Sequence, residues 1–595
     1  MKSIMNDDRP TRTMNRRACL RLLAAGTGST LAASLLTACG GGANATNSLN
    51  PQPTTTATAA GSASALTTAA ASPAVGASAP AASPVASGAS GGQVSVRWAK
   101  PATLHPLFST IGSEQQVERL MFGALVKMTD KLAPVPDLAE LVNLSPDATT
   151  YTFTLRQGIT FIDGTPLTAK DVVFTIERAV DKRTASYWRG RLLALRGASE
   201  YGDQKAATIS GLETPDDQTV KMTLAAPDAS WLTVIGNFAG LGILPSHVLK
   251  DTAPDQMAKS PFSFNPNVTA GVFQFSQYAT DQFLELKRNE RYSGPKAKLD
   301  RLFFKILTPD TALIQMETGE LDLMSVNATD AERLKKNTNL SVVSVPSPSL
   351  SSLTFNEDKP YLKDKRVRQA IQYAIDREGI VKEIFRGEAQ VVNSTIIGPD
   401  WMGTPSGLNT YAYNPDKARQ LLKGANWDSS RKLETIYISG SKEQDAYAPI
   451  IQQQCKEIGL TLDLLVVDAA EYNRKRISTN GYEVAFVNGG IFRADPNVSA
   501  QYFETVNFTP AGGNYARYSN PAVDDLFRVG RSMTNTDERK KTYSQLAQIL
   551  NEDLPWVYLW SPNSIFAYNK RLVGFKPPSY VDNPAWNADE WTVTK

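Results

Sequence analysis

Hydrophobic and polar positions alternate between the periods of strands and helices through most of the chain. Residues 151–155 place apolar or aromatic side chains at every second position, which predicts a half-buried strand. Residues 158–164 predict a second short strand and a turn. Over residues 172–180 the apolar spacing becomes helical, and Thr168, three residues before Asp171, predicts the cap at which that helix begins.

The same alternation continues toward the C-terminus. The apolar spacing predicts helices over 366–384, 416–423 and 446–458, and the last of these leads into a predicted strand over 460–467. Helices and strands that alternate in this way are typical of α/β proteins. Residues 94–595 have an ordinary apolar content and are enough for two or three domains.

Residues 1–38 have the parts of a secretory signal. A basic region with paired arginines at 16–17 precedes an apolar run over 22–36, and small residues stand before Cys39. This pattern predicts a lipoprotein signal that is cut before Cys39, and the paired arginines leave either the twin-arginine or the general export route open. The alternative is a transmembrane anchor, but polar residues 26–29 interrupt the run and no stop-transfer pattern follows.

Residues 39–93 comprise the lipidated Cys39 and a tract of Ala, Ser, Thr, Pro and Gly. From residue 40 to residue 93 the tract contains no Lys, Arg, Asp or Glu, and it has too few bulky apolar side chains to offset chain entropy. We expect a flexible tether with a mean reach of about 40 Å. The protein is therefore expected to be exported, and to be held by lipid at a periplasmic or cell-surface membrane.

Charge and cysteine content narrow the range of partners. The chain holds 62 Lys or Arg and 59 Asp or Glu, and removal of the more basic residues 1–38 leaves the remainder close to neutral. A basic footprint for nucleic acid is therefore absent. Of the three cysteines, only Cys455 would remain as a free thiol after cleavage and lipidation, so no disulfide within the chain is expected.

A longer series of motifs covers the chain after the tether. Residues 151–174 read Tyr-Thr-Phe-Thr-Leu-Arg-Gln-Gly-Ile-Thr-Phe-Ile-Asp-Gly-Thr-Pro-Leu-Thr-Ala-Lys-Asp-Val-Val-Phe. The other motifs lie at 104–107, 211–220, 286–292, 319–322, 355–356, 366–377, 414–422, 518–524, 552–559 and 573–575. Together they resemble family 5 of the bacterial solute-binding proteins, the dipeptide, oligopeptide and nickel receptors of ABC importers, although Ile162 replaces a common histidine.

Most of these motif residues have a structural interpretation. Asp163 and Gly164 are expected at a turn where glycine tolerates a positive φ. Asp376 and Arg377 are expected to end a helix with a local ion pair. Such residues identify the scaffold and leave the ligand open.

The resemblance implies an α/β, two-lobed periplasmic-binding-protein fold of class II with an extra subdomain. The two lobes would close on ligand about a two-stranded hinge, with the ligand cleft between them. By resemblance, lobe I with the extra subdomain is expected at 94–345, lobe II at 346–555, and a return to lobe I at 556–595.

The resemblance implies that the protein binds its ligand without catalysing any covalent change in it. The protein would capture a peptide or peptide-like organic solute and deliver it to ABC transporter permeases with separate ATPases. It would act as a monomer, without cofactor or metal. A sensory or scaffold receptor would share the same fold. A secreted hydrolase is disfavoured, because His105 and His247 are the only histidines and Ser439 to Lys442 lacks the partner motifs of penicillin-recognising enzymes.

The most telling cleft segment is 482–496. In the peptide receptors the matching segment supplies a carboxylate, four residues before the proline, that binds the α-amino group of the peptide. Phe492 occupies that position here, and a phenyl ring offers an ammonium only a cation–π contact. The neighbouring Arg493 either lies on the surface or favours an anionic ligand. Phe492 therefore disfavours an ordinary peptide with a free amine as the ligand. The alternative ligands are an acidic or N-blocked peptide, or a non-peptide organic solute.

Other cleft candidates rest on position in the family. They follow the first strand, lie on aromatic loops, or belong to the segment around Phe492. The aromatic groups have the alternative role of covering a core edge. The candidates are Thr103, Leu104, His105, Tyr187, Trp188, Trp401, Asn488, Gly490 and Asp495.

Overall fold

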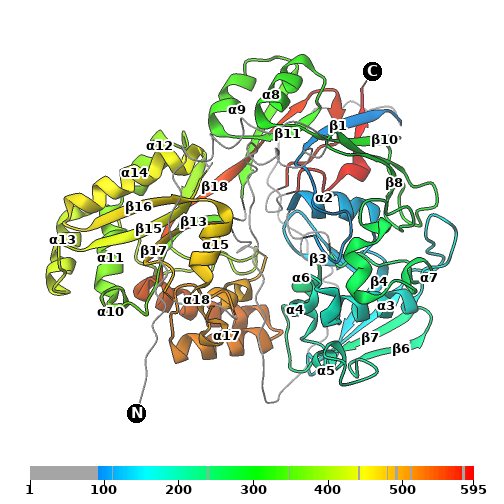
Figure 1. The fold of residues 1–595 in the computed structure, drawn as a ribbon, viewed down its shortest axis with the longest axis horizontal. Helices are drawn as coiled ribbons and strands as arrows, with labels where there is room; N and C mark the ends of the chain where they lie inside the picture. Colours follow the sequence, from blue (N-terminus) through cyan, green and yellow to red (C-terminus); the bar gives the residue numbers. More distant parts are fainter. Residues whose placement is uncertain are drawn as a thin grey trace, which may run out of the picture. The chain divides into compact units, whose positions relative to one another are not determined.

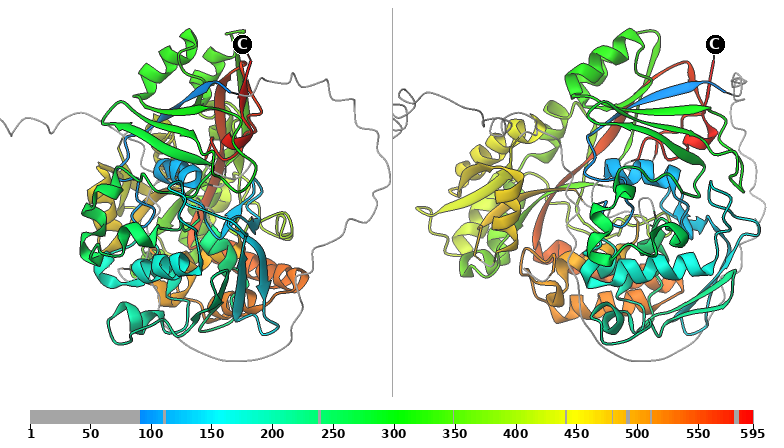
Figure 2. Two further views of the ribbon diagram at one scale, coloured as in Figure 1. Left: turned by 90° about the vertical axis from the view of Figure 1, so that its right-hand side faces the viewer. Right: turned by 45° about the vertical axis from the view of Figure 1, so that its right-hand side comes forward.

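The computed structural model describes residues 91–594 except 110–111, 237–239, 348, 440–441, 479, 490–493, 510–511 and 579–582 (Figure 1, Figure 2). The predicted signal, Cys39 and nearly all of the predicted tether lie outside the described residues. Regular structure begins at Gln93, where β1 starts, and the Gly92 N–H just before it donates to the Asp300 carboxylate at 2.8 Å.

A large mixed sheet connects the two halves of the described chain. Its strand order is β16-β15-β17-β13-β18-β11-β1-β10-β9-β8, and β12 and β14 also pair with β18. Its strands are β1 (Gln93–Trp98), β8 (Phe273–Ala279), β9 (Phe283–Arg288), β10 (Arg301–Ile306), β11 (Leu323–Val326), β12 (Leu340–Pro346), β13 (Leu350–Phe355), β14 (Ala389–Val391), β15 (Lys432–Ile438), β16 (Thr461–Val467), β17 (Val484–Gly489) and β18 (Trp556–Asn569).

A separate antiparallel sheet has the order β4-β5-β7-β6, with β4 (Ala139–Leu144), β5 (Thr150–Leu155), β6 (Leu212–Asp216) and β7 (Thr219–Thr223). Tyr151, Phe153 and Leu155 are the buried positions of β5, which confirms the strand predicted from their alternation. Two short ribbons pair β2 (Val126–Met128) with β3 (Pro134–Pro136), and β19 (Leu572–Val573) with β20 (Thr592–Val593).

Helices lie between the strands in both halves. In the first half they are α2 (Gly112–Met121), α3 (Ala169–Val180), α4 (Arg189–Leu192), α5 (Ala198–Gly202), α6 (Trp231–Gly236), α7 (Ser246–Leu249), α8 (Pro309–Thr318) and α9 (Ala328–Leu334). In the second half they are α10 (Pro360–Lys363), α11 (Lys365–Ala374), α12 (Arg377–Glu383), α13 (Pro415–Gly424), α14 (Lys442–Glu457), α15 (Ala469–Ile477), α16 (Ala500–Phe503), α17 (Pro521–Ser532) and α18 (Thr536–Asp553). The α/β class predicted from sequence is confirmed.

Among the described residues, every helix is too short or too polar to cross a bilayer.

The start of α3 is the one predicted from sequence. Thr168 is its N-cap and forms a capping box with Asp171, whose carboxylate accepts from the Thr168 N–H at 2.9 Å. The second carboxylate oxygen of Asp171 accepts from the Ser246 hydroxyl at 2.7 Å, so the cap also ties α3 to α7. The predicted helix 416–423 is confirmed as α13, and the predicted helix and strand over 446–467 are confirmed as α14 and β16.

The predicted helix over 366–384 is wrong as one element, because the chain breaks between α11 and α12. Ile375 is extended at φ −93° and ψ 117°, and the Asp376 side chain caps α12 by accepting from the Gly379 N–H at 3.0 Å. Arg377 donates to the carbonyls of Val392 and Thr410. Asp376 therefore begins a helix, and the predicted ion pair with Arg377 is replaced by contacts with distant backbone.

Residues 158–164 form a turn and a single bridge in place of the predicted strand. Thr160 pairs with Pro166 as an isolated bridge, and the Gly164 N–H donates to the Phe161 carbonyl at 2.9 Å. Gly164 has φ +91°, so the turn predicted at Asp163 and Gly164 is confirmed.

Two hydrophobic cores lie in the two halves that the large mixed sheet connects. The first core draws its buried apolar residues from positions 94–323 and again from 566–591, and the second core draws them from 350–560. A smaller cluster joins α8 and α9 to β18. We use "first core" and "second core" for these two groups and the elements that carry them.

The chain crosses between the cores at two adjacent places. One crossing is the 346–350 link from β12 to β13, and the other lies within β18, which Figure 1 shows running from one half to the other. The Ser561 hydroxyl lies within hydrogen-bonding distance of the Ser347 and Ser349 carbonyls, at 3.2 and 2.9 Å. The two crossings are therefore bonded to each other.

Candidate functional site

The turn after β1 holds the predicted residues Thr103, Leu104 and His105. The Thr103 hydroxyl accepts from the His105 N–H at 3.0 Å, and the Leu104 N–H donates to the Ser263 carbonyl at 2.7 Å. Leu104 and His105 are fully buried, and Thr103 is 8 % exposed. In this conformation the turn is part of the first core.

His105 is neutral in this environment. Its Nδ1 accepts from the Leu107 N–H at 3.2 Å, and its Nε2 is buried without a partner. Burial lowers the pKa of the imidazole to about 3, because the charged form loses its hydration. The side chain therefore contributes no positive charge to a ligand at neutral pH.

A buried acid, Glu118 of α2, lies behind the same turn. Its carboxyl group is hydrogen-bonded to the Ser109 hydroxyl. Burial raises the pKa of Glu118 to about 8, the Ser109 hydrogen bond opposes that rise, and the carboxyl group of Glu114 adds to it. Glu118 is therefore mostly protonated at neutral pH.

Tyr187 and Trp188 are held against the first turn. The Tyr187 N–H donates to the Leu107 carbonyl at 2.9 Å, and the Trp188 indole N–H donates to the Pro106 carbonyl at 2.9 Å. Both side chains are less than 10 % exposed. The structure thus brings together the candidates on the 103–105 turn and those at 187–188, which are far apart in sequence.

Arg191 of α4 covers this aromatic pair. Its guanidinium carbon lies 4.2 Å from the Tyr187 ring centroid and 5.7 Å from that of Trp188. It also donates to the Tyr187 hydroxyl at 2.8 Å. Within the described residues no carboxylate forms an ion pair with Arg191.

In the second core, Trp401 and Asp495 meet at Arg539 of α18. The Arg539 guanidinium donates to the Asp495 carboxylate at 2.9 Å and lies 4.9 Å from the Trp401 ring centroid. Asp495 and Arg539 are buried, and Asp495 also caps the next turn by accepting from the Asn497 N–H at 2.8 Å. Asp495 is therefore satisfied within its own core.

Asn488 lies at the end of β17 and is exposed. Its Oδ1 accepts from the Tyr447 hydroxyl at 3.3 Å. The remaining candidates Gly490, Phe492 and Arg493 lie outside the described residues.

Polar contacts connect the two cores next to these residues. The Asn497 amide donates to the Ser230 hydroxyl at 3.1 Å, and the Ala229 N–H donates to the Arg531 carbonyl at 2.8 Å. An exposed ion pair joins Lys131 Nζ to the Asp400 carboxylate at 3.0 Å.

A small apolar cluster lies between the same segments. Met128 and Leu132 of the first half are buried against Ala494 of the second, with Val498 packed beside them. The segment that carries Asp495 therefore contacts the other core through both polar and apolar groups.

Tyr502 of the second core occupies a charged and aromatic environment. Its ring lies 5.1 Å from that of Trp556 and 6.4 Å from that of Tyr515, centroid to centroid. Burial raises the pKa of its hydroxyl, whereas the positive charges of Arg476 and Arg191 lower it. These two arginines come from opposite cores.

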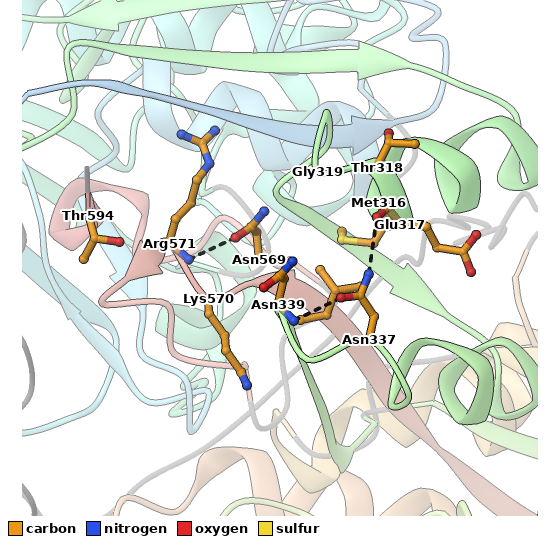
Figure 3. A pocket seen from close by; sticks show the side chains of 11 residues that line it. Met316, Glu317, Thr318, Gly319, Asn337, Asn339, Asn569, Lys570, Arg571 and Thr594 are labelled. Atoms are coloured by element: carbon orange, nitrogen blue, oxygen red, sulfur yellow. Dashed lines mark hydrogen bonds between the residues drawn. The ribbon is translucent and has the colours of Figure 1, made fainter.

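Two cavities in the described structure lie elsewhere. One has a volume of about 420 Å³ and is lined by polar groups of α8, the 337–340 turn and the end of β18, among them Asn337, Asn339 and Asn569 (Figure 3). The other, of about 20 Å³, is an apolar void beside Trp231 in the first core. Of the predicted ligand-lining residues that the structure describes, none borders either cavity.

The two histidines form no catalytic arrangement among the described residues. His247 Nε2 lies 2.8 Å from the Asp163 carboxylate, whereas the His105 ring accepts from the Leu107 N–H and packs on Phe108 and Phe262. In the same part of the chain no cluster of His, Cys, Asp and Glu could hold a metal ion. Cys455 is a buried free thiol.

The sequence-family model for the bacterial extracellular solute-binding proteins, family 5, matches residues 133–509, well over half of the chain. The chain belongs to this family. The match begins in the first half and ends after the Trp401, Asp495 and Tyr502 region, so it includes most of both cores.

Relatives and solved structures agree with the family 5 assignment. A Brucella ovis protein, provisionally described as an ABC transporter peptide-binding protein, is 30 % identical over 462 residues, which cover 76 % of this chain and 84 % of that protein. The oligopeptide-binding protein AppA of Bacillus subtilis is 26 % identical over 517 residues, covering 83 % and 90 %. The crystal structure of the ABC transporter substrate-binding protein CtaP of Listeria monocytogenes is similar with a TM-score of 0.74 at 27 % identity, covering 85 % and 100 %.

Membership in family 5 settles three of the predictions from sequence. The α/β periplasmic-binding-protein fold is confirmed. The family consists of extracellular solute-binding proteins, so this protein acts outside the cytoplasm. Its function is binding, and the prediction that it is no enzyme is confirmed.

The sequence interpretation missed several residues of this family 5 protein. Tyr187 and Arg191 are four residues apart, a spacing at which a helical arginine reaches an aromatic ring, so this contact had a signal. The sequence gives no signal for the contact of Arg539 with Asp495, because these residues meet only through the tertiary fold. Arg476 belongs to a basic run that ordinarily lies in solvent, and it is buried here.

Proposed function

We propose that this protein is an extracytoplasmic receptor that binds a peptide or peptide-like organic solute and delivers it to the permeases of an ABC importer. The observation that carries the proposal is the family 5 match over 133–509. The peptide-binding descriptions of the Brucella and Bacillus relatives support the ligand class.

The two cores are the lobes of this receptor in our proposal. Lobe I comprises 94–345 and 556–595, and lobe II comprises 346–555. The bonded crossings at 346–350 and within β18 are the hinge, a role supported by the hydrogen bonds of Ser561 to both sides of the first crossing. Hinge closure around a ligand is a common mode for two-lobed binding proteins.

The ligand is bound between the lobes. The 103–105 turn with Tyr187 and Trp188 would form one wall, and Asn488, Gly490, Phe492 and Arg493 would contribute to the other. Trp401 and Asp495 support the second wall through Arg539. Phe492 stands where the peptide receptors have a carboxylate that binds the α-amino group of the peptide. We therefore propose a ligand whose binding does not require an acidic side chain to pair with a free amine.

Attachment to the membrane completes the proposal. Residues 1–38 direct export and are removed by cleavage before Cys39, Cys39 is lipidated, and the uncharged tract that follows is the tether. Fractionation of cells that produce the full chain tests this part. The protein is expected with the membranes, and a Cys39→Ala variant is expected as unprocessed precursor. Equal fractionation and size of both would contradict the anchor.

The ligand class is tested by native mass spectrometry of the full chain, followed by denaturing release of bound molecules. Released peptides, or calorimetric binding of defined short peptides after the ligand has been removed, are expected. Loss of peptide uptake on deletion of the gene, with rescue by the wild-type gene, distinguishes import from sensing. A chain that binds no peptide in any of these assays would contradict the proposed ligand class.

A further inference from the structure

Residues 385–388 form a turn of the second core that lies beside the hinge. Phe385 anchors this turn, because its ring lies 5.3 Å from that of Trp560 of β18, centroid to centroid, and both residues are buried in the second core. The Glu388 N–H donates to the Phe385 carbonyl at 2.7 Å, and the Gly387 N–H donates to a carbonyl of α12 at 3.1 Å. The turn is therefore fixed to the second core by both side-chain and backbone contacts.

The strand that follows the turn pairs with β18 at the crossing. β14 lies antiparallel to residues 560–562 of β18, and the Asn563 N–H donates to the Glu388 carbonyl at 2.9 Å. These residues of β18 stand between its last member of the second core, Trp560, and its first member of the first core, Phe566. The backbone of the turn is thus bonded to the part of β18 that passes between the cores.

The Glu388 side chain extends from this turn to the other half of the molecule. Its carboxylate accepts from the Ser344 hydroxyl of β12, and it also accepts from the Asn563 side-chain amide at 3.0 Å. The same amide lies 3.0 Å from the Ser344 hydroxyl, so the three side chains contact one another. The neighbours of Ser344 in β12, Val343 and Val345, pack against the first core. Glu388 therefore joins the second core to a strand of the first half.

Arg386 makes a second contact of the same kind. Its Nη1 lies 2.8 Å from the carboxylate of Glu332 on α9, and both side chains are about half exposed. Arg386 has φ +53°, a left-handed conformation that is unfavourable for residues other than glycine. The turn thus takes a costly backbone conformation at the position whose side chain reaches α9.

The ion pair with α9 lies on the other side of the hinge from the contact between Ala229 and Arg531. Figure 1 shows α9 and α17 at opposite ends of the molecule with β18 between them. Glu332 belongs to α9, whereas the Arg531 carbonyl that accepts from the Ala229 N–H belongs to α17. Both contacts are formed in the same arrangement of the cores. A rotation about the crossings that separates Ala229 from Arg531 therefore also moves Arg386 relative to Glu332.

We propose that Arg386 and Glu388 form a strap behind the hinge that favours the arrangement in which the two cores touch. The inference rests on the two-lobed arrangement of the proposed function and adds positioning residues to it. A carboxylate hydrogen bond and an exposed ion pair have modest free energies, but small differences are enough to shift the balance between open and closed forms.

The strap acts on ligand affinity through closure. Its contacts include none of the predicted ligand-lining residues that the structure describes. When a ligand binds only a sparsely populated closed form, its apparent affinity is proportional to the population of that form. Loss of the strap therefore weakens every ligand by the same factor, whereas loss of a residue that touches the ligand changes affinities by factors that differ between ligands.

Hydrogen exchange of the Ala229 amide in the ligand-free full chain measures the strap without a ligand. This N–H donates to the Arg531 carbonyl across the cores at 2.8 Å, so separation of the cores exposes it to exchange. Glu388→Ala should speed its exchange about fivefold, which is the effect expected for the loss of one hydrogen bond. Glu388→Gln keeps an acceptor oxygen and should stay near the wild type. Glu332→Gln should speed the exchange about twofold, as expected for an exposed ion pair.

Glu383→Ala is the matched control, because this exposed acid of α12 pairs within the described structure only with the adjacent Lys382. It should leave the Ala229 exchange at the wild-type rate. The amides of β5 should be unchanged in every variant, which separates opening of the cores from general unfolding. Glu332→Gln alters only a surface side chain, so it keeps the strap testable if Glu388→Ala folds poorly.

Calorimetry with at least two short peptides of different sequence completes the test, and Glu388→Ala should weaken all of them by one factor. Unchanged Ala229 exchange in Glu388→Ala and in Glu332→Gln would overturn the strap and leave peptide binding intact. Factors that differ between peptides would also overturn it, because they would place Glu388 at the ligand. If the wild type bound no peptide, the proposed ligand class would be wrong, and the exchange rates would still decide the strap.

Discussion

Glu118→Gln should remove a large part of the pH dependence of stability. Glu118 is 2 % exposed, and in the folded protein burial raises the pKa of its carboxyl group to about 8 from the usual 4.5. A folded-state pKa above the unfolded-state value means that the folded protein holds the proton more tightly. The contribution of Glu118 to stability is therefore fully present below pH 4.5 and is lost as the pH rises toward 8.

The magnitude follows from the two pKa values. Between them, each pH unit costs about 1.4 kcal/mol, so raising the pH from 5.5 to 7.5 should lower the wild-type free energy of unfolding by about 2.5 kcal/mol through this group. Full burial means that solvent screening does not reduce this effect. Glutamine has nearly the same shape and does not titrate, so the variant should lack this loss.

Urea unfolding of wild type and Glu118→Gln at pH 5.5 and 7.5, followed by the same fluorescence signal, measures the difference directly. Other titrating groups contribute equally to both proteins and cancel. Glu213→Gln, an exposed acid on β6, is the control and should leave the wild-type pH dependence unchanged. If Glu118→Gln lost as much stability between the two pH values as the wild type, Glu118 would be ionised in the fold and the reasoning would be wrong.

Three further predictions concern the site. Arg539→Met should destabilise the protein by about 3–5 kcal/mol in urea unfolding, because it leaves the Asp495 carboxylate buried and unpaired, and an effect below 1 kcal/mol would show that Asp495 is hydrated. Asn497→Ala removes one hydrogen bond to Ser230 and should weaken ligand affinity about fivefold in calorimetry, since such a bond is worth about 1 kcal/mol to the closed form. Phe492→Asp should weaken binding of the native ligand and create affinity for peptides with a free amino terminus. Unchanged ligand affinity in calorimetry would show that Phe492 does not line the site.

Local patterns made much of the fold predictable from sequence. The cap at Thr168 and the alternation over 151–155 depend on neighbours within a few residues, and both appear as predicted. The helix over 366–384 failed because its break is set by distant groups. Arg377 is held by carbonyls of Val392 and Thr410, and no pattern within the helix records them.

The candidate site was predictable only in its parts. The 103–105 turn and Tyr187–Trp188 were named from position in the family, but their contact depends on hydrogen bonds from the Tyr187 N–H and the Trp188 indole to backbone carbonyls of a distant turn. Arg476 illustrates the limit, because a run of three basic residues predicts a solvated surface. Burial of one member depends on tyrosines that come from three other segments of the chain.

The contacts between the cores explain why a ligand should control closure. Away from the two crossings, the contacts among the described residues include two hydrogen bonds, the exposed ion pairs Lys131–Asp400 and Arg386–Glu332, and the small cluster around Ala494. Neutral hydrogen bonds contribute about 1 kcal/mol each and an exposed ion pair at most about 1 kcal/mol, so closure gains only a few kcal/mol. Loss of hinge freedom on closure opposes this gain. A ligand that contacts both cores and adds a few kcal/mol of differential binding therefore shifts the protein toward the closed form.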